Sequence, residues 1–367
     1  MRSRILLSAL VLSSPLAWGQ TPIAKYVPGT QADGAVYYLP KTQLRIAVQV
    51  EKTSYTPGEF CAYAQKYLKL DKVVASPTVA YRLISINIKA EGVADTSKCY
   101  RLKFNGKGAA SNLQLAEDGT LLAVNAQVEP EPAAVPFAPA KQEPRVNPRS
   151  LLTQEIVESG STAKMAELVA QEIYAIRDSR TMLSRGEAEF MPKDGEQLRL
   201  MLEQLKMTED AYMSMFAGVT EKDTAEYVFT YCPQRGKEND ILFRLSNRLG
   251  IVDKDDLSGK PYYISITDYH TVPAPVEDPK AKKKLSFDGL FVNVPGKIKV
   301  SIVKDTKPIG SMEFYAGQYG NVELLEGDLF NRKFTTHLTL NPLNGKIDKL
   351  EAEQPKQKKL SSQGDNK

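Results

Sequence analysis

The chain has 367 residues, of which 42% are apolar and 25% are charged. This composition is that of an ordinary globular protein, and it excludes collagen-like and fully disordered chains. A formal net charge of +4 is too small to indicate nucleic acid binding, and two histidines and three cysteines leave little material for a metal site. We therefore predict no nucleic acid partner, no metal and no cofactor.

Residues 1–19 have the pattern of a cleaved secretory signal peptide. Arg2 and Arg4 precede a short apolar run over residues 5–12, and the small residues of a cleavage site precede Gln20. The run is too short to span a bilayer, and no later window reaches the roughly 18 apolar residues of a membrane helix. We expect an exported protein, periplasmic or associated with the cell surface, without a transmembrane segment.

Residues 20–128 are expected to form an N-terminal β module with one short helix. Apolar and polar residues alternate over residues 44–50, which is typical of a strand with one buried face. Asp118-Gly119 lies between two apolar runs, which predicts a β-hairpin turn. Residues 129–150 follow as a proline-rich linker, because prolines remove backbone donors and hold a chain extended.

Residues 151–218 predict a helical hairpin. Their apolar side chains recur at helical spacing in two stretches, as expected for two amphipathic helices joined by a short connection. Ser161 is the expected N-cap of the first helix, and Asp194 with Gln197 forms a capping-box pattern before the second. Gly218 is the expected residue just after the second helix.

Residues 219–353 are expected to form a C-terminal β module. Residues 298–302 alternate like residues 44–50, and Asn344-Gly345 predicts a second hairpin turn. Residues 354–367 are polar and have no apolar stripe, so we predict a disordered tail. The fold class is predicted as α+β, with two antiparallel, sandwich-like β modules separated by the proline-rich linker and the αα-hairpin.

The two β modules have similar ends. Tyr37-Tyr38-Leu39-Pro40 and Val292-Asn293-Val294-Pro295 each precede an alternating strand, and each module closes with a hairpin turn of the Asp-Gly or Asn-Gly type. An internal duplication explains this similarity. Alternation followed by such a turn is also common in unrelated β proteins, so both explanations stay open.

Export places Cys61, Cys99 and Cys232 in an oxidising compartment. With three cysteines, at most one internal disulfide forms, and the sequence does not choose among the three pairings. We interpret the three cysteines as small buried thiols and not as reactive thiols.

Several segments resemble a family of secreted Bacteroidota proteins, domain of unknown function 4831. The resemblance is carried by the runs 161–167, 173–177 and 194–198 of the helical pair, and by 36–42, 55–60 and 256–261 in the β modules. It covers nearly the whole chain after the signal peptide. It implies export from a Gram-negative bacterium, and it brings no catalytic residue, cofactor or activity.

The sequence lacks the usual patterns of catalytic residues. There is no Gly-x-Ser-x-Gly, and the only candidate histidine bases, His270 and His337, are interpreted as surface residues. Asp253, Asp255 and Gly259 come near a calcium loop, but the glycine is one position late and no glutamate closes the loop. We predict no catalytic and no metal-ligating residue.

Two adjacent tyrosine pairs supply the one candidate contact surface. In a strand, one member of each pair faces away from the other, so outward rings among Tyr37, Tyr38, Tyr262 and Tyr263 would form a platform for sugars or extended peptide. Tyrosine is also favoured in strands for packing alone.

We therefore expect a non-catalytic envelope protein that binds or scaffolds a partner, an envelope protein or a glycan. The alternatives are a carboxylate-dependent hydrolase of envelope polysaccharide, which needs an acidic cleft, and an assembly subunit that oligomerises.

Overall fold

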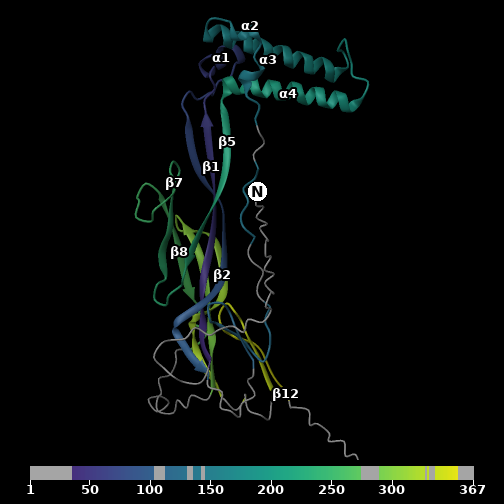
Figure 1. Cartoon of the computed structure of the whole chain (residues 1–367). Coiled ribbons are helices and arrows are strands. Elements are labelled where there is room, and N and C mark those ends of the chain that lie inside the picture. The colour runs from purple at the N-terminus through teal and green to yellow at the C-terminus, as the bar shows by residue number, and fades with distance from the viewer. Residues whose placement is uncertain are drawn as a thin grey trace, which may run out of the picture.

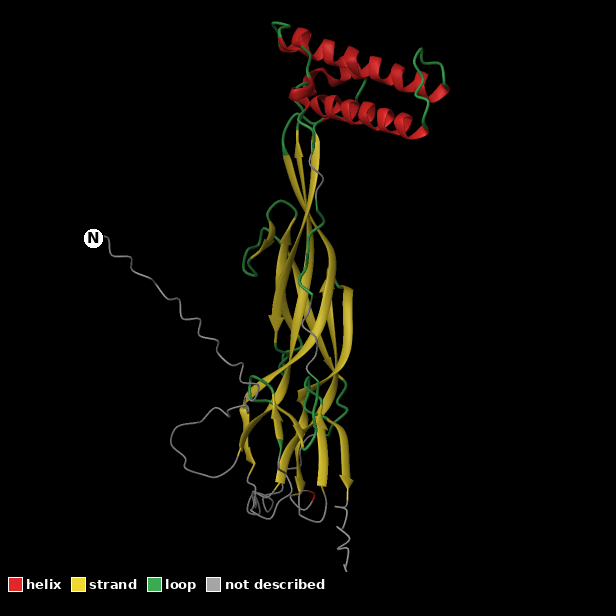
Figure 2. Cartoon of the chain, turned by 45° about the vertical axis from the view of Figure 1, so that its right-hand side comes forward, coloured by secondary structure: helices red, strands yellow, loops and turns green. Residues whose placement is uncertain are grey.

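The computed structural model describes residues 35–102, 112–129, 135–141, 145–273, 289–326, 329 and 335–353. Within these ranges the protein is mostly β, and a long β body carries a small helical head at one end (Figures 1 and 2). The expected signal peptide (1–19) and tail (354–367) lie outside the described residues. No helix of the described chain is long and apolar enough to cross a membrane.

Strands occupy both ends of the described chain, and the longest helices lie between them. The described strands are β1 (Ala35–Thr56), β2 (Thr78–Leu102), β3 (Leu113–Leu115), β4 (Leu121–Val124), β5 (Val219–Tyr231), β6 (Asn239–Ser246), β7 (Gly250–Val252), β8 (Lys260–Asp268), β9 (Gly289–Lys304), β10 (Lys307–Glu326), β11 (Thr335–Leu340) and β12 (Ile347–Glu353). The helices are the 3-10 turns η1 (Cys61–Tyr63) and η2 (Pro148–Leu151) and the α-helices α1 (Ala64–Leu68), α2 (Gln154–Val157), α3 (Thr162–Arg185) and α4 (Gly195–Ala217).

The strands pair antiparallel in three sheets, with the orders β2-β1-β5, β10-β9-β8-β6-β7 and β12-β11-β4-β3. These pairings correct the expected separation into two β modules. β5 of the range 219–353 pairs with β1 of the range 20–128, and β11 pairs with β4. The two β ranges therefore share sheets, which local sequence patterns do not reveal because the pairing partners lie far apart in the chain.

Alternation in the long strands builds the main core, which we call the shaft core. Leu44 and Ile46 of β1 and Ile298 and Val300 of β9 are fully buried, and they belong to one cluster with residues of β6, β8 and β10. Burying such a side chain contributes about 1.5–3 kcal/mol. Arg45 and Gln49, which alternate with these buried residues of β1, are polar, as the sequence predicts.

The two long hairpins, β1–β2 and β9–β10, contain the same irregularity. In the first, Leu39 alone opposes residues 95–98, and in the second, Pro295 alone opposes residues 317–320. The two expected hairpin turns follow at Asp118-Gly119 and Asn344-Gly345, where both glycines have positive φ. This shared one-against-four bulge is a structural argument for the internal duplication that the sequence leaves open.

The bulges lie where the shaft core gives way to a second cluster, the base core, which includes Tyr37 and Leu39 of β1 and Leu338 of β11. Here the side chain of Asn293 is 1% exposed and donates from Nδ2 to the backbone oxygens of Pro40 (2.8 Å) and Asn344 (2.9 Å). We call this cluster of polar contacts the waist. Additional contacts at the waist join Lys98 Nζ to Asn293 Oδ1 at 3.4 Å and Gln318 to both backbone groups of Thr42.

The helical head contains the expected αα-hairpin, formed by α3 and α4. The Ser161 hydroxyl accepts a hydrogen bond from the backbone N–H of Lys164 at 3.2 Å, which confirms the predicted N-cap. Asp194 precedes α4 as expected, but its side chain makes no capping hydrogen bond, so the predicted capping box is wrong. Gly218 directly follows α4, as expected, and its positive φ of 77° favours glycine there.

Direct contacts hold the head to the β body. The backbone N–H of Phe60 donates to the carbonyl of Met215 at 2.7 Å, and the Tyr55 hydroxyl donates to the carbonyl of Ala217 at 3.0 Å. Gly58 lies so close to α4 that an added Cβ would come within 2.3 Å of the Met215 oxygen. The attachment leaves no room for a side chain at this point.

Candidate docking surface on the helical head

Only the half of the helical hairpin nearest the β body has an apolar core of its own, the head core. Phe60, Ile156, Ile173 and Phe216 belong to this core, which collects side chains from the segments beside the hairpin as well as from α3 and α4. Phe60 and Phe216 contact each other with ring centroids 5.3 Å apart. This half is a helical layer with partners on more than one side.

The other half of the hairpin projects away from the β body (Figures 1 and 2). We call residues 177–208 the distal arm: the end of α3, the connection 186–194 and the first part of α4. Of these residues, only Leu205 packs against the head core, and it is partly buried. The arm is therefore a pair of helices without a third element of the head core packed on it.

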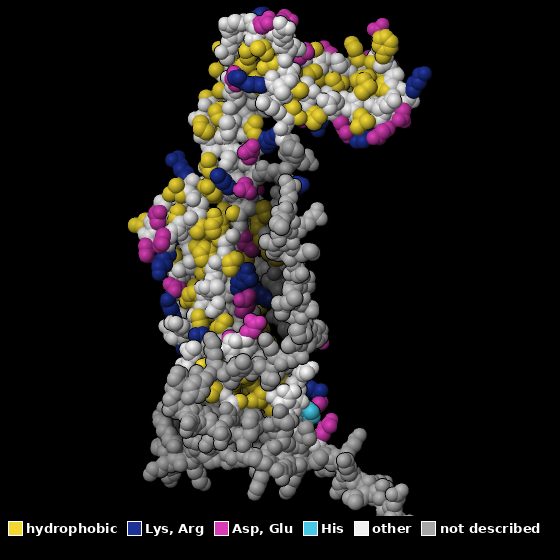
Figure 3. All heavy atoms as spheres, viewed as in Figure 1, with side chains coloured by type: hydrophobic (Ala, Val, Ile, Leu, Met, Phe, Trp, Pro, Cys, Tyr) yellow, Lys and Arg dark blue, Asp and Glu magenta, His cyan; other side chains and the backbone are white. Residues whose placement is uncertain are grey.

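The distal arm carries a group of exposed, large apolar side chains. Its members are Met182 (51% exposed), Phe190 (83%), Met191 (39%), Leu200 (53%), Met201 (43%) and Met207 (46%). Figure 3 shows hydrophobic side chains gathered on the projecting end of the head. Single exposed apolar residues are normal, but six large ones within residues 177–208 make the arm a candidate contact surface. Methionine suits such a site because its side chain is flexible and polarisable.

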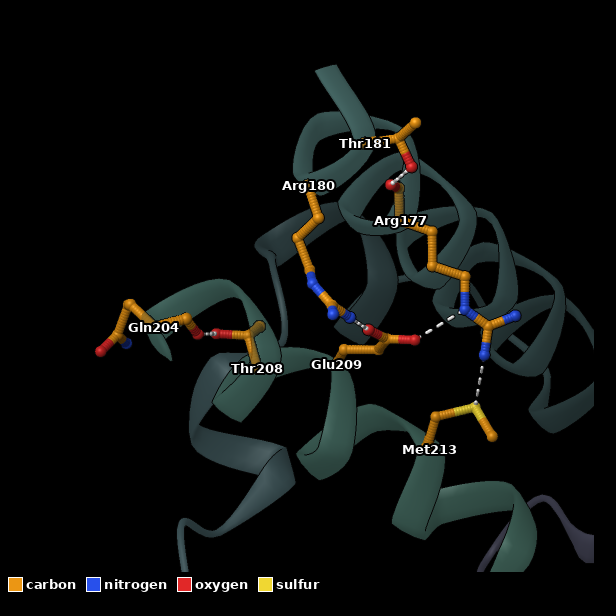
Figure 4. A network of polar contacts seen from close by, with 7 residues as sticks. All are labelled: Arg177, Arg180, Thr181, Gln204, Thr208, Glu209 and Met213. Carbon is orange, nitrogen blue, oxygen red and sulfur yellow. Dashed lines mark hydrogen bonds and ion pairs between the residues drawn. The ribbon is translucent and has the colours of Figure 1, made fainter. Parts of the chain in front are cut away.

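An ion-pair cluster fixes α3 against α4 at the start of the arm. The Glu209 carboxylate lies between the guanidinium groups of Arg177 and Arg180, with 2.6 Å from Arg177 Nε to Glu209 Oε1 (Figure 4). Burial alone would raise the pKa of Glu209, but the hydrogen bonds and charges of the two arginines outweigh burial and lower it. Arg177 also donates to the sulfur of Met213 at 3.5 Å. The cluster stiffens the helix pair that presents the apolar group.

A groove of about 1100 Å³ runs from the distal arm to the point where α4 meets the start of β5. It is lined by α4 from Met207 to Ala217, by the segment 145–148 and by the first residues of β5. Arg145 crosses it and donates to the Thr220 carbonyl at 2.7 Å. The groove contains two carboxylates, Asp210 and Glu221, from different elements.

The four candidate tyrosines do not form one platform. Tyr37 and Tyr262 are each 1% exposed and belong to different cores, the base core and the shaft core. Tyr38 and Tyr263 point the other way, as the strand period predicts, and Tyr263 is 38% exposed. Tyr37 and Tyr262 therefore have no exposed ring for a ligand, and a contact through Tyr38 or Tyr263 stays a prediction.

The buried hydroxyl of Tyr37 has a structural partner. It accepts from the Phe291 N–H at 2.8 Å and lies 3.3 Å from the Phe291 carbonyl oxygen. Burial raises the pKa of Tyr37, so the hydroxyl stays neutral. Tyr37 thus joins β1 to β9 in the base core.

The candidate histidines and the aspartate-rich loop have ordinary local contacts. His270 has positive φ and lies 3.4 Å from Asp268, and Nδ1 of His337 contacts the Asn125 carbonyl. Asp253 and Asp256 each accept a backbone N–H two residues on, as in common turns. Across the described ranges, no three His, Cys, Asp or Glu side chains are grouped to hold a metal ion.

All three cysteines are free. Cys99 is exposed, and Cys61 and Cys232 are half-buried. Burial raises the pKa of the Cys232 thiol, which disfavours the reactive thiolate.

Sequence reasoning missed the distal arm, although a signal for it exists. The apolar stripe expected for the second helix consists of Leu198, Met201, Leu202, Leu205, Tyr212 and Phe216, but Met201 is 43% exposed. Leu200 and Met207 lie seven residues apart, and so on one helix face that is separate from that stripe. A second apolar face on a predicted helix is a sign of a further contact surface.

The fold and this surface define an elongated β protein with a helical head. The distal arm of this head carries exposed apolar side chains that the head core does not cover. The chain belongs to the family described as Domain of unknown function (DUF4831), whose model matches residues 33–348. This confirms the domain of unknown function suggested by the sequence. No curated protein and no solved structure matches the chain.

Proposed function

We propose that the protein is an exported, non-catalytic envelope protein that binds a partner protein through the distal arm. The observation that carries this proposal is the group of six exposed apolar side chains on the distal arm, which the head core does not cover. An apolar, methionine-rich surface fits a protein partner better than a glycan, which needs directed polar groups and stacked aromatic rings.

The β body acts in this proposal as a spacer that holds the head away from its other end. The shaft core collects buried residues from β1 and from β8 and β9, which supports the sandwich-like arrangement expected from the sequence. The contacts of Phe60 and Tyr55 with α4 join the head firmly to this spacer.

Export and location in the periplasm or at the cell surface are part of the proposal, and they rest on the signal-peptide pattern of residues 1–19. The mass of the protein purified from cells tests this part. A chain that begins at Gln20 supports export, and a chain that retains residues 1–19 speaks against it.

Binding is preferred to hydrolysis because of the direction in which carboxyl pKa values shift. A glycosidase needs one carboxyl group with a raised pKa as its general acid. Among described carboxyl groups with a shifted pKa, hydrogen bonds and nearby charges lower it in each: Glu196, Glu209, Asp240, Asp256 and Glu313. Their partners hold these five groups as anions, so none of the five is a candidate general acid.

Capture of partners from an envelope extract tests the binding function. The mature protein is immobilised in three forms: wild type, the double variant Leu200→Glu with Met207→Glu, and the control Leu257→Glu. Leu257 is 83% exposed on the β body, so its variant adds a charge at an exposed leucine away from the arm. We expect a protein retained by wild type and control and lost with the arm variant. Retention by all three would refute the role of the arm.

A further inference from the structure

The outer face of the five-stranded sheet presents side chains in three ordered rows. Ile264 and Ile266 of β8 and Ile298 of β9 are buried in the shaft core, so the residues that alternate with them point outward. Residues that oppose each other in an antiparallel ladder share a face, and the register places the outward ones side by side. We call these rows the sheet platform: Ser265, Ser301 and Ser311; Thr267, Lys299 and Glu313; Tyr269, Lys297 and Tyr315.

The last row of the platform holds two exposed tyrosine rings, one on each side of Lys297. Tyr269 directly follows β8, and its backbone N–H donates to the Lys297 carbonyl at 3.1 Å. Tyr315 of β10 opposes Lys297 from the other side. Tyr269 is 43% exposed and Tyr315 is 46% exposed. Their backbones are two strand spacings apart, about 10 Å, so the row offers two separate rings to one extended ligand.

Polar contacts fix the side chains of the platform in place. The Glu313 carboxylate accepts a hydrogen bond from the Tyr269 hydroxyl at 2.7 Å and pairs with Lys297 Nζ at 2.7 Å. Lys297 Nζ also lies 5.3 Å from the centroid of the Tyr269 ring. The Lys297 ammonium and the Tyr269 hydroxyl lower the pKa of Glu313, which is therefore an anion. Side chains that are ordered in advance reduce the entropy that a ligand loses on binding.

The chemistry of the platform suits a sugar chain. A sugar ring has an apolar face that stacks on an aromatic ring, and its hydroxyl groups need donors and acceptors beside that ring. The platform supplies both, because its two rings adjoin the carboxylate of Glu313, the ammonium of Lys297 and the hydroxyl of Thr267. A protein interface usually has an apolar centre, whereas the middle row here is Thr267, Lys299 and Glu313.

The charge of the platform favours an acidic sugar. Lys297 and Lys299 belong to it, and Lys346 Nζ lies beside it, 5.8 Å from the centroid of the Tyr315 ring. Glu313 balances one of these three positive charges, which leaves an excess of two among these side chains. An anionic ligand complements this excess.

We propose that the sheet platform binds an acidic glycan chain, whose sugar rings stack on Tyr269 and Tyr315 and whose acid groups pair with Lys299 and Lys346. This second binding site lies on the β body, on residues separate from those of the distal arm. It goes beyond the proposed function, because it lets one molecule hold a glycan and a partner protein at the same time.

Affinity electrophoresis in gels that contain polysaccharide tests this proposal. The probes are polygalacturonate, alginate and hyaluronate, with neutral dextran for comparison. The mature protein is run as wild type, as Tyr269→Ala with Tyr315→Ala, and as Lys299→Gln with Lys346→Gln. Tyr174→Ala is the control for the rings, since Tyr174 is 44% exposed on the head. Lys66→Gln with Lys164→Gln removes the same charge from exposed lysines of the head.

We expect at least one acidic polysaccharide, and not dextran, to retard the wild type and both controls. Each platform variant should raise the dissociation constant by roughly tenfold or more. The replaced side chains lie outside the core, and circular dichroism verifies that each variant is folded. Four outcomes overturn the proposal: no retardation by any acidic probe, equal retardation by dextran, unchanged binding of the tyrosine variant, or an equal loss in the two lysine variants.

Discussion

Replacement of Asn293 by alanine tests whether the waist holds the two β cores together. Asn293 is 1% exposed, and its Nδ2 donates to the backbone oxygens of Pro40 and Asn344. Its Oδ1 accepts from Lys98 at 3.4 Å. Alanine leaves two buried carbonyl oxygens without this donor. A buried polar group left without its partner costs about 1–3 kcal/mol, so for two such groups we expect the free energy of unfolding to fall by about 2–6 kcal/mol.

Asn321→Ala is the matched control for this replacement. Asn321 also donates from Nδ2 to a backbone oxygen, that of Pro273 at 2.7 Å, but the contact is exposed to water, which can replace the lost donor. We expect this control to change the free energy of unfolding by at most about 1 kcal/mol. Urea denaturation followed by circular dichroism gives both values. Equal losses for the two variants would refute the structural role assigned to the waist.

Two further predictions concern the helical head. Gly218→Ala should destabilise the protein by clearly more than Gly186→Ala, because both residues have positive φ but an added Cβ comes within 2.5 Å of the Thr56 oxygen only at position 218. Urea midpoints measure this difference, and equal midpoints for the two variants would contradict the close packing of Gly218 against Thr56. The lowered pKa of Glu209 should stabilise the fold above the ordinary glutamate pKa of about 4.3, and this contribution should disappear as the pH falls through the lower folded-state pKa. Glu209→Gln should lack this loss of stability at low pH. Curves of stability against pH with the same shape for both proteins would contradict the role assigned to Glu209.

The elements that the sequence predicts well are those fixed by neighbouring residues. The turn at Asn344-Gly345 forms because glycine accepts the positive φ that position 345 requires. The N-cap at Ser161 forms because a serine precedes the apolar stripe directly. Asp194 satisfies the same local rule, yet its side chain makes no capping bond. Local preference therefore places the helix starts better than it predicts their hydrogen bonds.

The pairing of strands and the exposure of the arm depend on distant parts of the chain. Nothing near Val219 in the sequence says that β5 pairs with β1, since the choice is made by the packing of whole sheets. In the same way, the spacing of Leu200 and Met207 predicts an apolar helix face but does not say whether another element covers it. The candidate docking surface becomes visible only when the rest of the head is in place.

Crosslinking in living cells tests the central claim, that the distal arm binds a protein. A photoreactive amino acid is placed at position 200 on the arm or at position 257 on the β body, both of which are exposed leucines in the native chain. Irradiation should give a specific protein adduct from position 200 and none from position 257, and mass spectrometry of the adduct identifies the partner. No adduct from position 200, or the same adducts from both positions, would contradict the claim.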